Sequence, residues 1–180
     1  MRTGQLVSDR SRRLDAHTGR VLILLRHFGA TAEKPLEGLT KLAKLDFLMR
    51  YPAFTDRLLA DLGADWTLGA EPTDDERQAV ESRMVRYKYG PWDDRYYPVL
   101  GTLVGLGLVT LSKAGRTLVM SLTPAGADLA SDIAGQEDWQ QVDFRASFLR
   151  THFDITGSRL KNLIYTKLPE VIDRPIRTLI

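Results

Sequence analysis

Hydrophobic positions recur at helical spacing over most of the chain. Leu14–Phe28 carries apolar residues at this spacing and predicts a helix. Leu36–Pro52 is apolar on almost every side, apart from a polar stripe of Glu37, Lys41 and Lys44. A helix with so narrow a polar face is buried on most sides, so we expect this one to be the central helix of the core.

Two shorter helices are predicted next. The first begins at Pro52, because proline suits the first helical turn, and it ends at Gly63. Thr73 and Glu76 then have the spacing of a capping box, which predicts a helix that continues to about Ser82.

The segment RMVRYKYG, residues 83 to 90, alternates as a strand does. One face is partly basic and the other is aromatic, with Met84, Arg86 and Lys88 against Val85, Tyr87 and Tyr89. Gly90-Pro91 predicts a turn, and we expect Tyr89 and Trp92 to fill the gap beneath it. A helix follows, whose buried stripe is expected to be Tyr96, Leu100, Leu103 and Val104.

The residues after this helix predict a two-stranded hairpin. The apolar positions alternate on both sides of a turn at Lys113–Arg116, with Val109 and Leu111 before it and Leu118, Met120 and Leu122 after it. Thr123-Pro124 then supplies an N-cap and a first-turn proline for a helix through Ile133.

The last third is predicted to be helical again. One apolar stripe consists of Trp139, Val142, Ala146, Leu149 and Phe153, with Phe144 and Phe148 beside it. Thr156 can cap a final helix. These apolar helices either fold back on the core or bury against another chain. For the end, DRPIRTLI, a frayed tail is the first expectation, and insertion of Ile176, Leu179 and Ile180 into a partner is the alternative.

The order of these elements is that of a winged helix-turn-helix. GLVTLSKAGRTLVMSLTPAGADLA is similar to the wing and the following helix of many bacterial winged-helix proteins. LTKLAKLDFLMRYP, together with RMVRYKYGPWDDRYYPVLGTLVGLGLV, resembles the middle component of three-component ABC-ATPase systems. These are prokaryotic conflict systems that include the Lamassu anti-phage and anti-plasmid type. The resemblance covers roughly Leu39 to Ala130.

This resemblance implies a fold and a role. The fold is mainly α (α+β), with a winged helix-turn-helix core, a small antiparallel wing and additional N- and C-terminal helices. We expect a flexible basic arm at residues 1–13, a winged-helix domain at residues 14–135 and a C-terminal helical extension at residues 136–180. The implied role is that of a non-enzymatic subunit beside an SMC-like coiled-coil ATPase and an effector, often a nuclease.

Composition narrows the classes of partner. The net charge of +2 gives no basic excess that would by itself drive tight nucleic-acid binding, although 18 arginines outnumber 7 lysines. The chain has no cysteine, which excludes disulfides and a thiolate zinc site. Without an apolar run of membrane length or the apolar core of a signal peptide, we expect a cytoplasmic protein with no membrane contact.

The helix between the two predicted β segments is poorly suited to reading bases. Its outward face offers Asp94, Tyr97, Gly101 and Thr102 rather than cations, and the aspartates at its start would repel phosphate. Tyrosine beside small residues favours a protein contact. A weak, sequence-independent contact with double-stranded DNA phosphate remains a secondary hypothesis, with the candidate residues Arg83, Arg86, Lys88, Lys113 and Arg116.

Catalytic signatures are lacking. His17, His27 and His152 have no metal-ligand spacing, and Asp74-Asp75-Glu76 is the acidic first turn of a helix. The chain has neither a Walker-type glycine loop nor GxSxG. We therefore expect no enzymatic activity, no metal and no cofactor.

The resemblance implies a structural subunit that connects an SMC-like ABC ATPase to its effector in a defence complex, and this is the function that we expect. The candidate partner contacts are Tyr97, Phe144, Phe148, Ile176 and Leu179. The alternative is a stand-alone winged-helix transcriptional regulator, dimeric through its terminal helices. A small enzyme ranks last.

Overall fold

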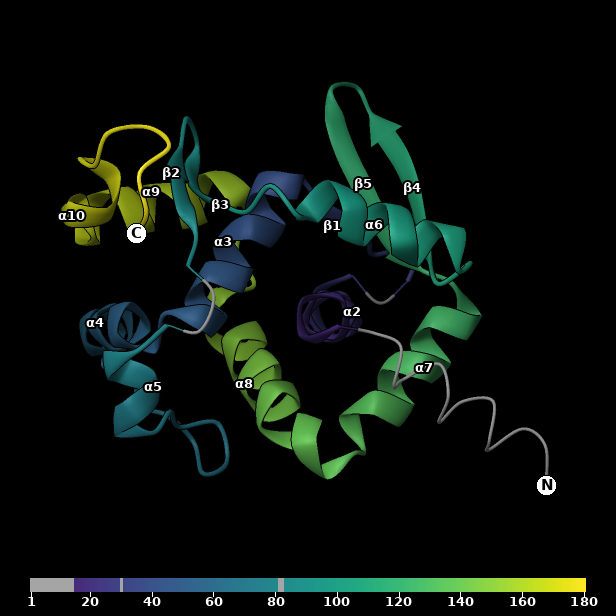
Figure 1. The fold of residues 1–180 in the computed structure, drawn as a ribbon, viewed down its shortest axis with the longest axis horizontal. Helices are drawn as coiled ribbons and strands as arrows, with labels where there is room; N and C mark the ends of the chain where they lie inside the picture. Colours follow the sequence, from purple (N-terminus) through teal and green to yellow (C-terminus); the bar gives the residue numbers. More distant parts are fainter. Residues whose placement is uncertain (1–14, 30, 81–82) are drawn as a thin grey trace.

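The computed structural model describes residues 15–29, 31–80 and 83–180. The fold is mixed α+β and mostly helical, with a small antiparallel sheet (Figure 1). The basic arm expected at residues 1–13 lies outside the described residues. Within the described part of the chain, no helix is both long enough and apolar enough to cross a membrane.

Two helices form the centre of the core, α2 (Ala16–Phe28) and α3 (Leu39–Arg50). The side chains of Val21–Leu25 are completely buried, because other helices surround α2, which Figure 1 shows end-on. Residues Leu42–Met49 of α3 are also buried, as expected of a central helix. Lys44 is only 2% exposed, so its expected place on an exposed polar stripe is wrong. The reason is that α2, α8, α9 and β3 all pack on α3.

The next two helices are α4 (Pro52–Leu62) and α5 (Asp74–Gln78). The predicted capping box of α5 is present. Thr73 Oγ1 accepts a hydrogen bond from the Glu76 backbone N–H at 3.2 Å, and Glu76 Oε2 accepts one from the Thr73 N–H at 2.8 Å. The helix ends at Gln78, short of the predicted end at Ser82, because Ala79 already has an extended backbone.

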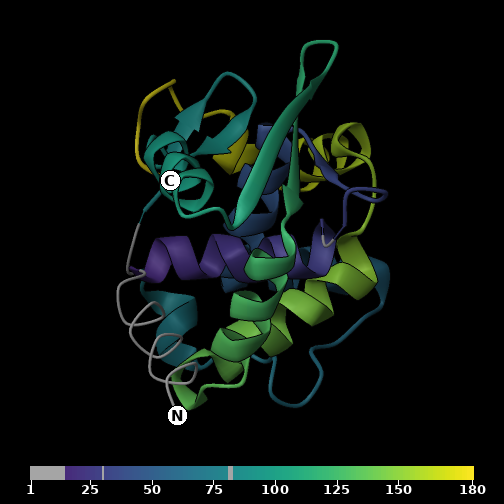
Figure 2. The same cartoon turned by 90° about the vertical axis from the view of Figure 1, so that its right-hand side faces the viewer.

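A three-stranded antiparallel sheet has the order β1-β5-β4, where β1 is Leu36–Glu37, β4 is Val109–Ala114 and β5 is Thr117–Leu122. Glu37, expected on the helical polar stripe, therefore belongs to a strand. The predicted β4–β5 hairpin is confirmed, and its two-residue turn begins with Gly115 at φ +61, a conformation that favours glycine. This hairpin projects beyond the body of the molecule in both views (Figures 1 and 2).

A second hairpin consists of β2 (Val85–Tyr87) and β3 (Gly90–Trp92). Gly90-Pro91 was expected to be a turn into a helix, but it is the start of the return strand, and Lys88 and Tyr89 form the turn instead. Trp92 is buried as expected, whereas Tyr89 is 47% exposed and does not fill a gap. A turn so far from the core exposes its tip to solvent.

The remaining helices pack around the core. They are α6 (Tyr96–Gly105), α7 (Pro124–Ala134), α8 (Glu137–Phe153), α9 (Gly157–Lys167) and α10 (Pro169–Ile172). Both α7 and α8 pack on α2, and both α8 and α9 pack on α3. Of the two alternatives for the C-terminal helices, the structure therefore shows packing against the core of the same chain.

Candidate interaction surface

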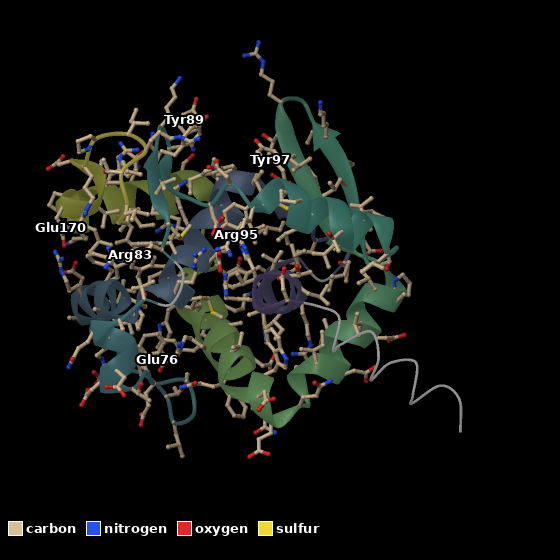
Figure 3. The ribbon with its side chains drawn as sticks, in the orientation of Figure 1. Glu76, Arg83, Tyr89, Arg95, Tyr97 and Glu170 are labelled. Carbon is tan, nitrogen blue, oxygen red and sulfur yellow. The ribbon has the colours of Figure 1, made fainter. Side chains whose placement is uncertain are left out.

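Helix α6 divides into a buried and an exposed face. Val104 was expected on the buried stripe but is 41% exposed, and Val99 is buried in its place. Tyr97 is 67% exposed, and the neighbouring Gly101 and Thr102 are also exposed. Figure 3 shows Tyr97 on the same side of the molecule as Tyr89. The outward face of α6 therefore carries an aromatic ring together with apolar and small side chains.

Tyr97 belongs to a row of aromatic rings that runs from β2 to α6. The ring centroids of Tyr87 and Trp92 are 5.5 Å apart, and those of Trp92 and Tyr97 are 5.9 Å apart. Both tyrosines are partly exposed, while Trp92 is buried between them. Aromatic pairs at these separations are attractive, so the row fixes α6 against the β2–β3 hairpin.

The two aspartates before α6 are both neutralised. Asp93 is only 7% exposed and accepts hydrogen bonds from the Arg95 backbone N–H at 3.0 Å and from Arg95 Nη2 at 2.7 Å. Asp94 is exposed, and both of its carboxylate oxygens lie 3.0 Å from Arg177 Nη1. The expected repulsion of phosphate by this pair is thus weakened by partners that the sequence pattern did not indicate.

Beneath the start of α6 lies a buried ionic network centred on Asp46 of α3. Its fully buried carboxylate accepts hydrogen bonds from Arg20 Nε at 2.5 Å, from Arg50 Nη1 at 3.2 Å and from the Tyr96 hydroxyl at 2.7 Å. Arg50 also donates to Asp93 at 2.9 Å. The network therefore links α2, α3 and the start of α6, and it sets the position of α6.

The electrostatics of this network indicate a structural role. Burial by itself raises the pKa of Asp46, but the Arg20 charge and the Arg50 charge lower it well below its ordinary range. Burial and then Asp46 raise the pKa of Tyr96 well above its ordinary value. An ionised carboxylate that accepts three hydrogen bonds is a poor base, so we assign it to positioning rather than to proton transfer.

The basic candidates occupy separate places. Lys113 and Arg116 are exposed at the tip of the β4–β5 hairpin, and Lys88 is exposed at the tip of the β2–β3 hairpin. Both hairpins project from the same side of the molecule (Figures 1 and 2). These three cations remain surface residues, as the sequence predicted.

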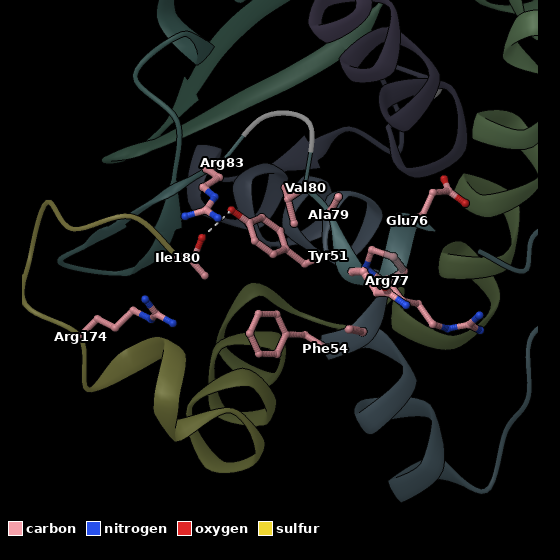
Figure 4. A pocket seen from close by; sticks show the side chains of 12 residues that line it. Tyr51, Phe54, Glu76, Arg77, Ala79, Val80, Arg83, Arg174 and Ile180 are labelled. Carbon is pink, nitrogen blue, oxygen red and sulfur yellow. Dashed lines mark hydrogen bonds between the residues drawn. The ribbon is translucent and has the colours of Figure 1, made fainter. Parts of the chain in front are cut away.

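Arg86 is not a surface cation, whereas Arg83 is exposed. Arg86 is only 9% exposed, and its Nε donates a hydrogen bond to the Ile172 carbonyl at 2.8 Å. The prediction that Arg86 contacts DNA phosphate from the surface is therefore wrong, because its side chain is buried. Arg83 lines a cavity of about 480 Å³ with Tyr51 and Arg174 (Figure 4). The alternation of β2 points Arg86 inward because the C-terminal segment covers that face.

The C-terminal segment is paired with β2, so the expected frayed tail is wrong. The Arg86 N–H donates to the Thr178 carbonyl at 2.8 Å, and the Arg177 N–H donates to the Arg86 carbonyl at 2.6 Å. The Ile180 N–H donates to the Met84 carbonyl at 2.9 Å, and the Ile180 side chain is buried. The edge of a two-stranded hairpin has free backbone groups, and this segment satisfies them.

The apolar partner candidates have different surroundings. Ile176, Leu179 and Phe144 are exposed by 59%, 51% and 50%. Phe148 is only 4% exposed, because its ring stacks on Trp66 with centroids 4.7 Å apart. Phe148 is therefore a core residue and is removed from the candidate surface.

The three histidines are scattered over the structure. His17 lies between Asp46 and Asp93, with ring nitrogens 3.6 and 4.0 Å from their carboxylates, and His27 Nε2 lies 2.7 Å from Asp143. In the described ranges, no group of three His, Cys, Asp or Glu side chains could hold a metal ion. The expected lack of enzymatic activity stays a prediction.

The sequence analysis did not identify Asp46 as the centre of the ionic network beneath α6, nor Lys44 as a buried residue. Asp46 is the only acidic residue in LTKLAKLDFLMR, and Arg50 follows it at helical spacing, which is the signal that was available. Lys44 gave no such signal, because its burial depends on α9 and the β2–β3 hairpin.

Comparison of the chain with protein-family models, with curated proteins and with solved structures gave no significant match.

Proposed function

We propose that the chain is a winged-helix protein. The order α2-β1-α3, followed later by α6-β4-β5, and the sheet order β1-β5-β4 support this assignment. Helices α4 and α5 and the β2–β3 hairpin are then an insertion between α3 and α6. In this assignment α6 corresponds to the helix that DNA-reading members place in the major groove, and the β4–β5 hairpin is the wing.

One observation carries the functional proposal: the exposed face of α6 has no charged side chain. Direct base reading relies on Arg, Lys, Asn and Gln, and Tyr96–Gly105 contains none of these. Arg95 precedes the helix and its guanidinium is held by Asp93. The exposed Tyr97, beside small residues that permit close approach, is typical of a protein contact instead.

The proposed role is that of a non-catalytic cytoplasmic subunit that connects an SMC-like ABC ATPase to its effector in an anti-phage or anti-plasmid complex. The resemblance of LTKLAKLDFLMRYP together with RMVRYKYGPWDDRYYPVLGTLVGLGLV to the middle component of such systems supports this choice of partners. Any contact of the wing tip, Lys113 and Arg116, with DNA would be weak and independent of sequence.

The test is affinity purification of the tagged chain from its native host at moderate salt, with mass spectrometry of the bound proteins. We expect a long coiled-coil ATPase and a second subunit to be retained. Tyr97→Glu places a charge in the centre of the proposed contact and should lower ATPase recovery by about tenfold or more, the size expected of an interface hot spot.

The matched control is Leu62→Ser, because Leu62 is 49% exposed at the end of α4 and is not among the candidate contacts. This variant should retain the ATPase as the wild type does. Recovery of the chain alone, as a dimer that prefers one duplex over a scrambled one by about a thousandfold or more, would refute the connector and support the transcriptional regulator.

A further inference from the structure

Three lysines lie on the elements that meet at the turn of the β2–β3 hairpin. Lys44 comes from α3, Lys88 from the turn itself and Lys161 from α9. A Cβ atom built on Gly90 would lie 3.8 Å from Lys44 Cε and 3.9 Å from Tyr165 Cε1, so the hairpin, α3 and α9 are in contact here. The charge of Lys161 acts on Lys44, so these two cations lie near each other, and the turn that carries Lys88 lies beside them.

Two tyrosines hold the outer lysines in position. Lys88 Nζ lies 5.3 Å from the ring centroid of Tyr89, and Lys161 Nζ lies 5.2 Å from that of Tyr165. The Tyr165 hydroxyl donates to the Lys88 carbonyl at 3.5 Å, which joins α9 to the turn. A cation over an aromatic face keeps its full charge, so both ammonium groups remain able to attract an anion.

No carboxylate offsets this charge. Across residues 15–29, 31–80 and 83–180, no carboxylate oxygen pairs with the ammonium groups of the three lysines. Other lysines do have partners, since Lys34 and Lys41 pair with Asp154. Like charges held together without counter-charges repel one another, and a bound anion would remove that repulsion.

Lys44 makes the imbalance larger. Its side chain is 2% exposed, and its Nζ donates one hydrogen bond, to the Thr40 carbonyl of its own helix at 3.1 Å. An ammonium group has three N–H donors. Burial, and then the charge of Lys161, lower the pKa of Lys44 to about 8. At neutral pH it therefore still carries its proton, as a buried cation with few partners.

We propose that Lys44, Lys88 and Lys161 form a binding site for a phosphate group of a nucleic-acid backbone. Lysine ammonium groups bind phosphate as point charges, without sequence discrimination. An extended polyanion suits the place, because Lys88, Tyr89 and Lys161 are exposed. The wing, with Lys113 at its tip, projects from the same side of the molecule (Figures 1 and 2).

The test measures binding of a labelled duplex of arbitrary sequence to the full chain by fluorescence anisotropy, over a series of salt concentrations. Lys88→Met and Lys161→Met should each weaken binding by about threefold to tenfold and lower the slope of log K against log salt by about 0.9, as for one lost phosphate contact. Lys34→Met, which removes a lysine outside the site, is the matched control and should bind as the wild type does.

A chemical footprint of the wild type provides a second measurement that does not depend on the variants folding. Reductive methylation followed by mass spectrometry should modify Lys88 and Lys161 less in the presence of duplex, and Lys34 equally in both samples. A competition experiment separates a site for backbone phosphate from a site for free inorganic phosphate. Inorganic phosphate is added to the duplex complex, and chloride of equal ionic strength is added to the control. A backbone site predicts no displacement beyond the chloride control.

Three results would overturn the proposal. They are the absence of duplex binding at low salt, site variants that match the wild type in affinity and slope, and displacement by inorganic phosphate at matched ionic strength, which would indicate a small phosphate ligand. The site goes beyond the connector function and shares no residue with the α6 face. Loss of the ATPase from the Tyr97→Glu variant and loss of duplex binding from the lysine variants are therefore separate outcomes.

Discussion

Replacing Lys44 with methionine should stabilise the folded protein. Lys44 is a buried ammonium group whose Nζ has one described hydrogen bond, to the Thr40 carbonyl. Methionine has a similar unbranched length and suits an apolar environment, so it should fill the same space between α3, α9 and the β2–β3 hairpin. The variant removes the charge while it keeps most of the packing.

The size of the effect follows from the pKa of Lys44. Its change from the ordinary value of 10.5 to about 8 means that the folded state disfavours the charged form by about 3 kcal/mol, since one pKa unit corresponds to about 1.4 kcal/mol. The lost hydrogen bond to Thr40 offsets about 1 kcal/mol of this gain. Lys44→Met should therefore raise the free energy of unfolding at neutral pH by about 2 kcal/mol.

The sign of the pH dependence is fixed by the same values. Below pH about 8 Lys44 is protonated in both the folded and the unfolded chain, so the full penalty acts on the wild type. Between about 8 and 10.5 the folded chain loses the proton first, and the stability of the wild type rises relative to the variant. The advantage of the methionine variant should thus be largest at neutral pH and should shrink in alkali.

Urea denaturation followed by circular dichroism, at neutral pH and again at alkaline pH, measures both effects. Lys41→Met is the control, because Lys41 lies nearly one turn earlier on α3 and has an ion pair with Asp154. It should give no stabilisation and lose at most about 1 kcal/mol. A Lys44→Met variant that is less stable than the wild type, or whose advantage is the same at both pH values, would refute the reasoning.

Two further substitutions test the packing beneath the interaction surface. Asp46→Ala leaves the Arg20 guanidinium without its carboxylate partner and removes one of the two carboxylates of Arg50. It should lower the free energy of unfolding by about 3 to 5 kcal/mol, measured by urea denaturation; a loss below about 1 kcal/mol would contradict the proposed network. Gly126→Ala would place a Cβ atom against the Leu108 carbonyl oxygen, so α7 must move away from the residue that precedes β4. This overpacking should cost about 1 to 3 kcal/mol, seen as a lower Tm, and an unchanged Tm would show that the approach is looser than described.

The local signals in the sequence predicted where many elements begin and end. Thr73, Thr123 and Thr156 each cap a helix with the side chain, and Gly63 ends α4 in the left-handed conformation. The β4–β5 hairpin was also predicted, with Gly115 in its turn. These features depend on hydrogen bonds and backbone angles within a few residues, so the order of residues alone specifies them.

The candidate surface was predicted only in part. Tyr97 and Lys113 are exposed as expected, because their surroundings are set mainly by their own helix or hairpin. Phe148 and Arg86 were assigned to the surface but are buried, by Trp66 and by the C-terminal segment. In both cases the partner comes from a segment far away in the sequence, which periodicity cannot indicate.

The sequence by itself thus determined where most helices lie, three of their N-caps, the β4–β5 hairpin and the lack of charge on α6, all of which are local properties. Only the tertiary structure decided that Asp46 and Lys44 are buried, and that Lys44 and Tyr165 lie against the β2–β3 hairpin. The physical reason is that the burial and ionisation of a side chain depend on every element packed around it. Arg20 binds Asp46 across 26 residues, and Tyr165 reaches Lys88 across 77.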